Sequence, residues 1–367
     1  MKPQPESMRG ATIVGTGKYV PDRVLNNADF EKMVDTSDEW IRERTGIIER
    51  RIAAPDQASS DLAVNASRNA LAMAGLGPED IDHIVLATTS PDRYLPSCAC
   101  TVQRKLGATR AAAYDMFAAC TGFVFGLGLG RSLIASRTAD SVLVIGVETL
   151  SRIVDYTDRN TCVLFGDAAG AVVLRPCEPG TGILSVIMKS DGELGEVLVI
   201  PAGGSARPAS EATVKAKEHF IQMQGRKLFP FAVRSMEESL RQALAAAGLT
   251  PADLEVVLAH QANLRILDAV RERLGLPAER VPINIERYGN TSSASIPLLL
   301  DELVRAGRIK KDDVVGFSAF GGGATWGSSV MRWTMERVAP EAEREGAATA
   351  GARAAHAPAA AAAIRET

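Results

Sequence analysis

Short apolar runs alternate along the chain with longer segments in which apolar residues recur at helical spacing. The runs 84–87 and 142–145 are typical of strands that are buried on both faces of a sheet. The segments 60–74 and 236–247 have the spacing of amphipathic helices. This alternation predicts a layered α/β fold.

One stretch of this pattern occurs twice. Residues 71–81 and 244–254 share the same order of a helix end, a glycine stop and a proline-started turn, and a buried strand follows each. Matching positions are 173 residues apart, which is too long a period for a solenoid. We therefore expect two similar α/β halves, residues 1–180 and 181–338.

The last segment, residues 339–367, departs from this pattern. It is rich in alanine, with glycine, proline and scattered charges, and it has no apolar stripe that would join a core. Such a composition is typical of a disordered tail.

Composition narrows the class of function. A chain of 367 residues with 46% hydrophobic residues is long enough for a large buried core. A net charge of −3 argues against a sequence-independent nucleic-acid binder, which would be strongly basic. No run reaches the roughly 18 apolar residues that span a bilayer, and no signal peptide follows the polar start. We expect a cytoplasmic protein with neither nucleic acid nor membrane as a partner.

The five cysteines form an odd, sparse set that does not indicate a disulfide framework. Cys98 and Cys100 have no second ligand pair nearby, so we expect no zinc site. Cys120 lies between a predicted strand and a predicted helix of small and apolar residues. A helix N-terminus favours the thiolate, which is the reactive form of cysteine. On position alone, Cys120 fits a nucleophile no better than it fits a small core residue.

Of the four histidines, His260 is the best partner for Cys120. It follows the buried strand 256–259 and precedes the start of a helix, where α/β folds place their sites. The alternative is a hydrogen-bonded core histidine. The other three lie in the tail, before a strand and in a charged stretch: His356, His83 and His219.

Two further segments have compositions that suit a site. Residues 288–293 form a polar turn that contains Asn290, although a capped helix start has the same composition. Residues 320–327 contain three consecutive glycines. Such a run lets backbone N–H groups approach a ligand closely, as an oxyanion hole requires, and a flexible turn is the alternative.

In combination these segments resemble the β-ketoacyl-acyl carrier protein synthase III family of the thiolase superfamily. The resemblance extends from about Met8 to Trp333. Each motif alone is weak, whereas all of them in one order are specific. They are residues 36–47, 118–123, 165–170, 260–265, 289–291 and 320–327. The resemblance implies a homodimer and a thiolase fold, in which two duplicated halves form a five-layered αβαβα arrangement.

The resemblance also implies a decarboxylative Claisen condensation that initiates fatty acid synthesis. A primer acyl-CoA would load its acyl group onto Cys120, and the N–H groups of Cys120 and Gly322 would form the oxyanion hole. Malonyl-acyl carrier protein would then lose CO2, with His260 and Asn290 donating to the enolate oxygen. No metal or other cofactor is implied, because decarboxylation supplies the driving force.

Substrate-binding positions follow from the same resemblance. Trp40 and Arg159 match the side chains that sandwich the adenine of CoA, and Arg44 matches a nucleotide or phosphate contact. Asn263 matches a pantetheine contact. Arg265 matches the site where the acidic acyl carrier protein docks.

The acyl pocket would include Phe165 and, from the partner subunit, Leu95. Leu95 is smaller than the Phe of strict acetyl-CoA users, so longer or branched primers are expected. Pro230 departs from the family, because typical members carry Lys there, and this puts the details of the docking patch in doubt.

Three alternatives remain. The first is a related ketosynthase or acyltransferase of polyketide or secondary metabolism. The second is a hydroxymethylglutaryl-CoA synthase-like enzyme, for whose catalytic Glu the sequence offers no candidate. The third is an inactive scaffold subunit, against which the joint presence of Cys120, His260 and Asn290 argues.

Overall fold

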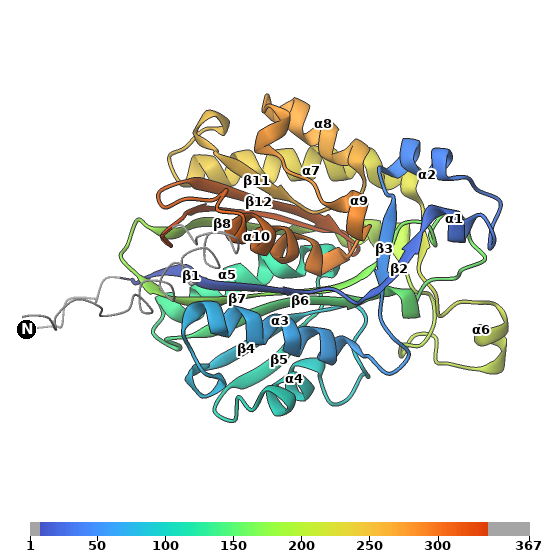
Figure 1. The fold of residues 1–367 in the computed structure, drawn as a ribbon, viewed down its shortest axis with the longest axis horizontal. Helices are drawn as coiled ribbons and strands as arrows, with labels where there is room; N and C mark the ends of the chain where they lie inside the picture. The colour runs from blue at the N-terminus through green and yellow to red at the C-terminus, as the bar shows by residue number, and fades with distance from the viewer. Residues whose placement is uncertain (1–7, 337–367) are drawn as a thin grey trace, which may run out of the picture.

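The computed structural model describes residues 8–336, so the predicted tail, 339–367, lies outside the described residues. Two β-sheets form the centre of the molecule (Figure 1). The first sheet has the strand order β1 (Gly10–Tyr19), β7 (Asp167–Cys177), β6 (Val142–Thr149), β4 (His83–Ala87), β5 (Ala112–Met116). The second has the order β11 (Val256–Ala259), β12 (Val314–Gly321), β13 (Thr325–Arg332), β8 (Gly182–Ser190).

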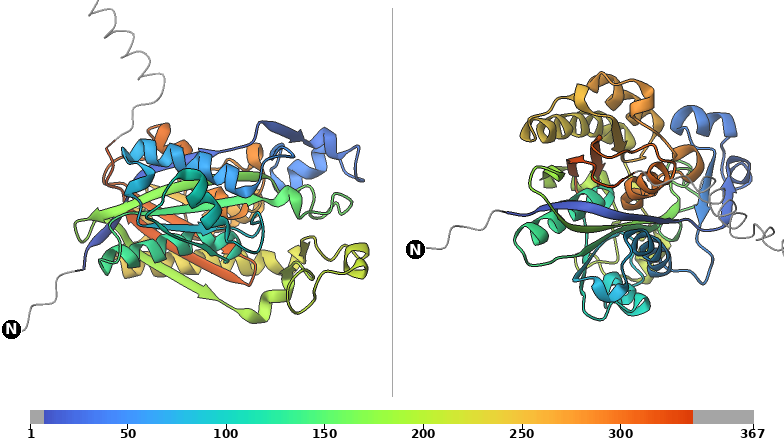
Figure 2. Two further views of the ribbon diagram at one scale, coloured as in Figure 1. Left: turned by 90° about the horizontal axis from the view of Figure 1, so that it is seen from below. Right: turned by 60° about the vertical axis from the view of Figure 1, so that its left-hand side comes forward.

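Helices lie between the two sheets and on their outer faces (Figures 1 and 2). α5 and α10 contact both sheets, α3 and α4 cover the first sheet, and α7 covers the second with α8 packed against it. Their bounds are α3 (Ser59–Ala74), α4 (Cys98–Leu106), α5 (Gly122–Ala135), α7 (Gly225–Ala246), α8 (Leu264–Leu274) and α10 (Ser295–Arg305). The five-layered αβαβα arrangement is therefore confirmed.

The remaining helices and strands are short. β2 pairs with β3, and β9 pairs with β10, in two small antiparallel sheets. α6 lies in an excursion that projects from the layers in Figure 1 and in the left view of Figure 2. The bounds are β2 (Arg23–Asn26), β3 (Glu49–Ile52), β9 (Leu198–Val199), β10 (Gln222–Met223), α1 (Asn27–Phe30), α2 (Asp38–Thr45), α6 (Glu211–Lys215) and α9 (Ile285–Tyr288).

The repeated sequence pattern has the same local structure in both copies. After α3 the chain turns at Gly75 (φ 66°), and after α7 it turns at Gly248 (φ 70°). A 3₁₀ turn and a strand, β4 or β11, follow each glycine. The first sheet takes its strands from residues 10–177 and the second from 182–332, which supports two halves divided near residue 180.

The helix predicted over residues 236–247 is longer than its pattern indicates. α7 begins at Gly225 and continues through Pro230. Proline lacks an N–H, so the helix loses only the bond to the carbonyl of Arg226, close to its first turn. Leu228 and Phe231, which flank Pro230 in the sequence, pack against the core and hold this part of the helix in place.

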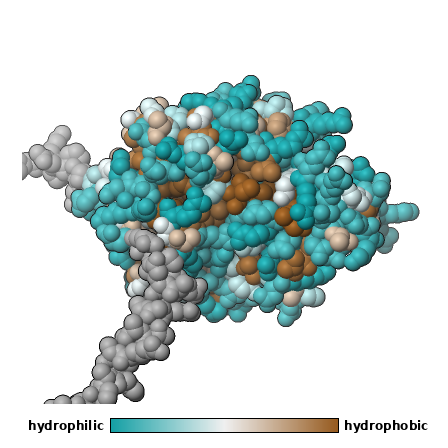
Figure 3. Space-filling view, turned by 45° about the horizontal axis from the view of Figure 1, so that its top comes forward, coloured by the Kyte–Doolittle hydropathy of each residue, from teal (hydrophilic) through white to brown (hydrophobic). Residues whose placement is uncertain are grey.

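The surface carries both polar and apolar regions. Polar residues cover most of the face in Figure 3, and apolar residues gather in hollows near its centre. Within residues 8–336, no helix has both the length and the apolar character needed to cross a bilayer.

The packing of β1 on α3 yields a test of the fold. A Cβ on Gly17 would overlap the carbonyl oxygen of Ala66 and the backbone nitrogen of Ala70. No rotamer change relieves a clash with backbone atoms. We expect Gly17→Ala to lower the free energy of unfolding by at least about 3 kcal/mol in urea denaturation. Gly204→Ala is the matched control, because no heavy atom lies within 4 Å of its added Cβ. Equal stability of the two variants would contradict this packing.

Candidate active site

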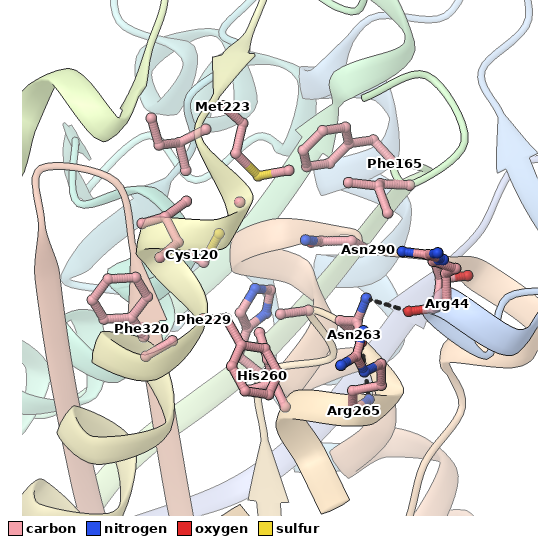
Figure 4. Close-up of a pocket in the computed structure, with 18 of the residues that line it drawn as sticks. Arg44, Cys120, Phe165, Met223, Phe229, His260, Asn263, Arg265, Asn290 and Phe320 are labelled. Atoms are coloured by element: carbon pink, nitrogen blue, oxygen red, sulfur yellow. Dashed lines mark hydrogen bonds between the residues drawn. The ribbon is translucent and has the colours of Figure 1, made fainter. Parts of the chain in front are cut away.

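A cavity of about 580 Å³ brings together side chains from both halves of the chain. Cys120 comes from the first half, whereas His260 and Asn290 come from the second, and all three line the cavity (Figure 4). The predicted substrate contacts that also line it are Trp40, Arg44, Phe165, Asn263 and Arg265. Three predicted site residues lie outside this lining, namely Leu95, Arg159 and Gly322.

Cys120 lies in a tight turn between β5 and α5, as the sequence predicted. The turn is a 3₁₀ helix, η2 (Ala119–Thr121), and α5 begins directly after it. Ala119 has φ 45°, a left-handed conformation that is rare for a residue with a Cβ. Strained backbone of this kind is common at functional sites, and here it places the thiol at the amino end of α5.

The glycine run packs against the backbone of this turn. A Cβ on Gly321 would lie 2.7 Å from the backbone nitrogen of Cys120. Thr325, at the other end of the hairpin, donates from Oγ1 to the carbonyl oxygen of Ala118 over 3.0 Å. The hairpin is thereby fixed beside the nucleophile, and Gly322 follows at its tip.

His260 is almost completely buried at the end of β11, with 1% of its surface exposed. Its Nδ1 lies 2.8 Å from Oγ of Ser295, at the start of α10. Burial lowers the pKa of His260 to about 3, so the imidazole is neutral at neutral pH and carries one N–H. Ser295 was not among the predicted site residues, although a serine at the start of an apolar helix is a recognisable feature.

Asn290 is fixed through both its backbone and its side chain. Its backbone N–H donates to the carbonyl oxygen of Leu164 over 2.9 Å, and its own carbonyl accepts from the N–H of Gly166 over 3.0 Å. The Ser292 N–H donates to Asn290 Oδ1 over 2.9 Å. Because the amide oxygen faces Ser292, the amide NH2 is directed into the cavity (Figure 4). Phe165, on the paired segment, lines the cavity beside it.

The thiol of Cys120 is protonated in the ligand-free protein. Burial raises its pKa to about 12, and a negative charge on the nearby Glu148 would act in the same direction. The polar side chain of Ser292 acts against this increase. The helix N-terminus was expected to favour the thiolate, but at this buried position the effect of burial is larger.

Trp40, on α2, contacts two guanidinium groups at the mouth of the cavity. The Cζ atoms of Arg44 and Arg159 lie 5.5 and 5.1 Å from the centre of its ring. Arg159 Nη1 also donates to the backbone carbonyl oxygen of Asp35 over 2.7 Å. Arg159, which does not line the cavity itself, is thus joined to it through Trp40. Flat aromatic and guanidinium faces suit a purine.

Asn263 connects α8 to α2 at the same mouth. Its Oδ1 accepts from the N–H of Arg265 over 2.9 Å and caps α8, while its Nδ2 donates to the carbonyl oxygen of Arg44 over 3.0 Å (Figure 4). The Arg265 guanidinium lies over the ring of Phe229, 5.6 Å from its centre. The cavity mouth is therefore basic and partly aromatic.

Comparison with known proteins identifies the family. The curated β-ketoacyl-[acyl-carrier-protein] synthase III of Caldanaerobacter subterraneus subsp. tengcongensis is 52% identical over 324 residues, which cover 88% of this chain and 98% of that protein. The chain belongs to the β-ketoacyl-acyl carrier protein synthase III family. The model of 3-oxoacyl-[acyl-carrier-protein (ACP)] synthase III matches residues 114–192, and the model of its C-terminal part matches residues 244–333.

Solved structures support this assignment. The 3-oxoacyl-[acyl-carrier-protein] synthase III of Aquifex aeolicus VF5 has a TM-score of 0.82 and 47% identity over 88% of this chain and all of that one. The priming β-ketosynthase of the R1128 polyketide pathway has a TM-score of 0.84 and 34% identity over 92% of this chain and all of that one. The predicted family, thiolase fold and acyltransferase class are confirmed, and the hydroxymethylglutaryl-CoA synthase alternative loses its support.

The buried thiol predicts a pH dependence for alkylation. Because its pKa is raised, the reactive thiolate fraction at neutral pH is small. We expect the rate of Cys120 alkylation by iodoacetamide to rise about tenfold per pH unit from pH 6 to 9.5 in the ligand-free protein. The site is followed by peptide mass in a Cys100→Ser background, since Cys100 is exposed. A plateau below pH 8 would show that burial does not control the thiol.

Proposed function

We propose that the protein condenses a primer acyl-CoA with malonyl-acyl carrier protein through an acyl-Cys120 intermediate, at the start of fatty acid synthesis. The observation that carries this proposal is the convergence of Cys120, His260 and Asn290 in one cavity. The 52% identity to a named synthase III over nearly its whole length supports the same reaction.

In the first step Cys120 Sγ attacks the thioester carbonyl carbon of the primer. A C–S bond forms to the enzyme, the bond to the CoA sulfur breaks, and the thiol proton leaves with CoA. The backbone N–H groups of Cys120 and Gly322 hold the oxyanion, which fits the packing of the glycine hairpin on this turn. One such donor contributes about 3 kcal/mol to transition-state stabilisation.

In the second step malonyl-acyl carrier protein loses CO2, and the electron pair moves to the thioester oxygen as an enolate. The Asn290 NH2 and His260 Nε2–H donate to this oxygen. A neutral His260 has its single N–H on Nε2 when the Ser295 hydroxyl donates its one proton to Nδ1 and not to the carbonyl oxygen of Ser292, which lies 2.9 Å away. The enolate carbon then attacks the acyl group and releases Cys120. The carboxyl of malonate drives the reaction, so the step requires no metal or redox cofactor.

The cavity mouth provides the contacts for CoA and for the carrier protein. The adenine of CoA enters between Trp40 and Arg159, which move apart from their 5.1 Å contact to admit it. Arg44 contacts a phosphate, and Asn263 contacts pantetheine. Arg265 attracts the acidic carrier protein, because opposite charges steer association. The arrangement of these side chains around one opening supports this assignment.

The active form is a homodimer in the cytoplasm. Three large apolar side chains near the ends of β4 and β5 are strongly exposed in the single chain, Tyr94 by 83%, Leu95 by 86% and Phe117 by 75%. β5 is an edge strand of its sheet. Exposed apolar residues beside an open edge favour burial against a partner. Leu95 then reaches the acyl pocket of the partner subunit.

A role in starting a polyketide is the second candidate function. The 34% identity to the R1128 priming ketosynthase, with a TM-score of 0.84, favours it. The chemistry at Cys120 is the same in both cases, and the two functions differ in the primer and in the carrier protein.

Intact mass after incubation with a panel of acyl-CoAs tests the first step. We expect the wild type to gain one acyl group and Cys120→Ala to gain none. Isobutyryl-CoA and longer primers should react as well as acetyl-CoA, because Leu95 is smaller than Phe. No adduct with any acyl-CoA would contradict the proposed function, whereas reaction with acetyl-CoA alone would contradict only the expected primer range.

The two steps should respond differently to loss of Asn290. Asn290→Ala removes a donor that acts on the enolate, so we expect malonyl decarboxylation to fall at least about a hundredfold while acylation of Cys120 is retained. Release of labelled CO2 and intact mass measure the two steps. Asn160→Ala, another asparagine in the cavity lining, should leave both steps within about threefold. Equal loss of both steps in Asn290→Ala would refute the assigned role.

A further inference from the structure

Glu148 is a fully buried acid directly behind the cavity. It lies near the end of β6, none of its surface is exposed, and it does not line the cavity. Its hydrogen-bond partners within residues 8–336 are hydroxyl and backbone N–H groups, with no cationic side chain among them. Burying an unpaired carboxylate is expensive, so this position requires a reason.

On one side, the carboxyl group holds the segment that follows β4. Its Oε2 accepts from the Ser90 hydroxyl over 2.6 Å. The N–H and the hydroxyl of Thr89 both donate to the same oxygen over 3.0 Å. These donors identify Oε2 as the acceptor oxygen of the group.

On the other side, Oε1 contacts the 3₁₀ turn η7 (Ser292–Ala294) before α10. It lies 3.1 Å from Ser292 Oγ and 3.0 Å from Ser293 Oγ. Ser293 Oγ also lies 3.0 Å from the carbonyl oxygen of Ala87, and a hydroxyl has only one proton to donate. If that proton is given to Ala87, the contact with Oε1 requires a proton on the carboxyl group. Burial raises the pKa of Glu148, which agrees with a neutral acid.

This turn connects Glu148 to two reacting groups. The N–H of Ser292 donates to Oδ1 of Asn290 and orients its amide, and the Ser292 side chain acts to lower the pKa of the Cys120 thiol. Ser292 has φ 47°, so its conformation needs support from its surroundings. The turn also packs on β6 itself, because a Cβ on Gly146 would overlap the carbonyl oxygen of Ser293.

We propose that Glu148 is a positioning residue, a neutral carboxylic acid that ties the segment after β4 to the turn before α10. Through this turn it sets the Asn290 amide and the Ser292 hydroxyl beside Cys120. The inference rests on the proposed function for the roles of Cys120 and Asn290. A neutral acid suits the reaction, because a carboxylate at this position would destabilise the thiolate of Cys120. Glu148 acts without contacting substrate, since it does not line the cavity.

Two variants of similar size separate this role from others. Glu148→Gln supplies an acceptor oxygen and a donor NH2, which are the groups of the neutral acid, without a charge. Glu148→Met fills the space but supplies neither hydrogen bond. Three rates are measured on each full-length variant: acylation by acyl-CoA, decarboxylation of malonyl-acyl carrier protein, and alkylation of Cys120 against pH.

We expect Glu148→Gln to keep all three rates within about threefold and to keep the pH profile of alkylation. Glu148→Met should lose at least about tenfold in decarboxylation, more than in acylation, because the Asn290 amide is misplaced. If Glu148→Met does not fold, Glu148→Asp replaces it, since its shorter side chain cannot reach both segments.

The proposal is overturned if Glu148→Gln loses as much as the Met or Asp variant, because a charged carboxylate would then be required. It is also overturned if the Met or Asp variant keeps its decarboxylation rate, or loses both steps equally. Failure of the proposed function would appear separately, as a wild type that no acyl-CoA acylates. In that case alkylation of Cys120 still tests the proposal, because Glu148→Met should shift its pH profile and Glu148→Gln should not.

Discussion

The site depends on close packing between the two halves of the chain, above all where the glycine hairpin after β12 packs on the backbone of Cys120. An added Cβ at Gly321 would lie 2.7 Å from the nitrogen of Cys120, so no side chain fits between them. The nucleophile belongs to one half, whereas His260 and Asn290 belong to the other. This contact, together with the hydrogen bonds of Asn290 to Leu164 and Gly166, therefore sets the distances among the three. Displacements of about 1 Å are enough to cost roughly a hundredfold in rate.

Burial gives the reacting centre a common character, because Cys120, His260 and Glu148 are all neutral at rest. Burial raises the pKa of Cys120 and Glu148 and lowers that of His260, which in each case favours the uncharged form. Charge therefore develops only during the reaction, first on the thioester oxyanion and then on the enolate. Fixed N–H donors stabilise such charge most strongly where water is excluded. Burial of the three side chains thus both keeps them neutral at rest and strengthens the proposed electrostatic catalysis.

The layers and the placement of Cys120 and His260 could be predicted because each depends on local sequence. Both residues lie between a strand and the start of a helix, and both neighbourhoods have clear patterns. Glu148 could not be predicted, since its contact with Ser292 joins residues 144 positions apart through sheet packing. A single acid in an otherwise apolar strand was the available clue. The start of α7 was hidden by Pro230, whose usual effect on helices is outweighed by core contacts.

The sequence repeat also explains why the turn that contains Cys120 resembles the turn that Glu148 contacts. The 3₁₀ turns before α5 and α10 are again 173 residues apart, and their first residues, Ala119 and Ser292, have φ 45° and 47°. Cys120 and Ser293 therefore occupy equivalent positions of the two halves. The first turn presents its middle side chain to the cavity, whereas the second directs it to the Glu148 carboxyl. One strained turn, used twice, thus provides the nucleophile in one half and an anchor for Asn290 in the other.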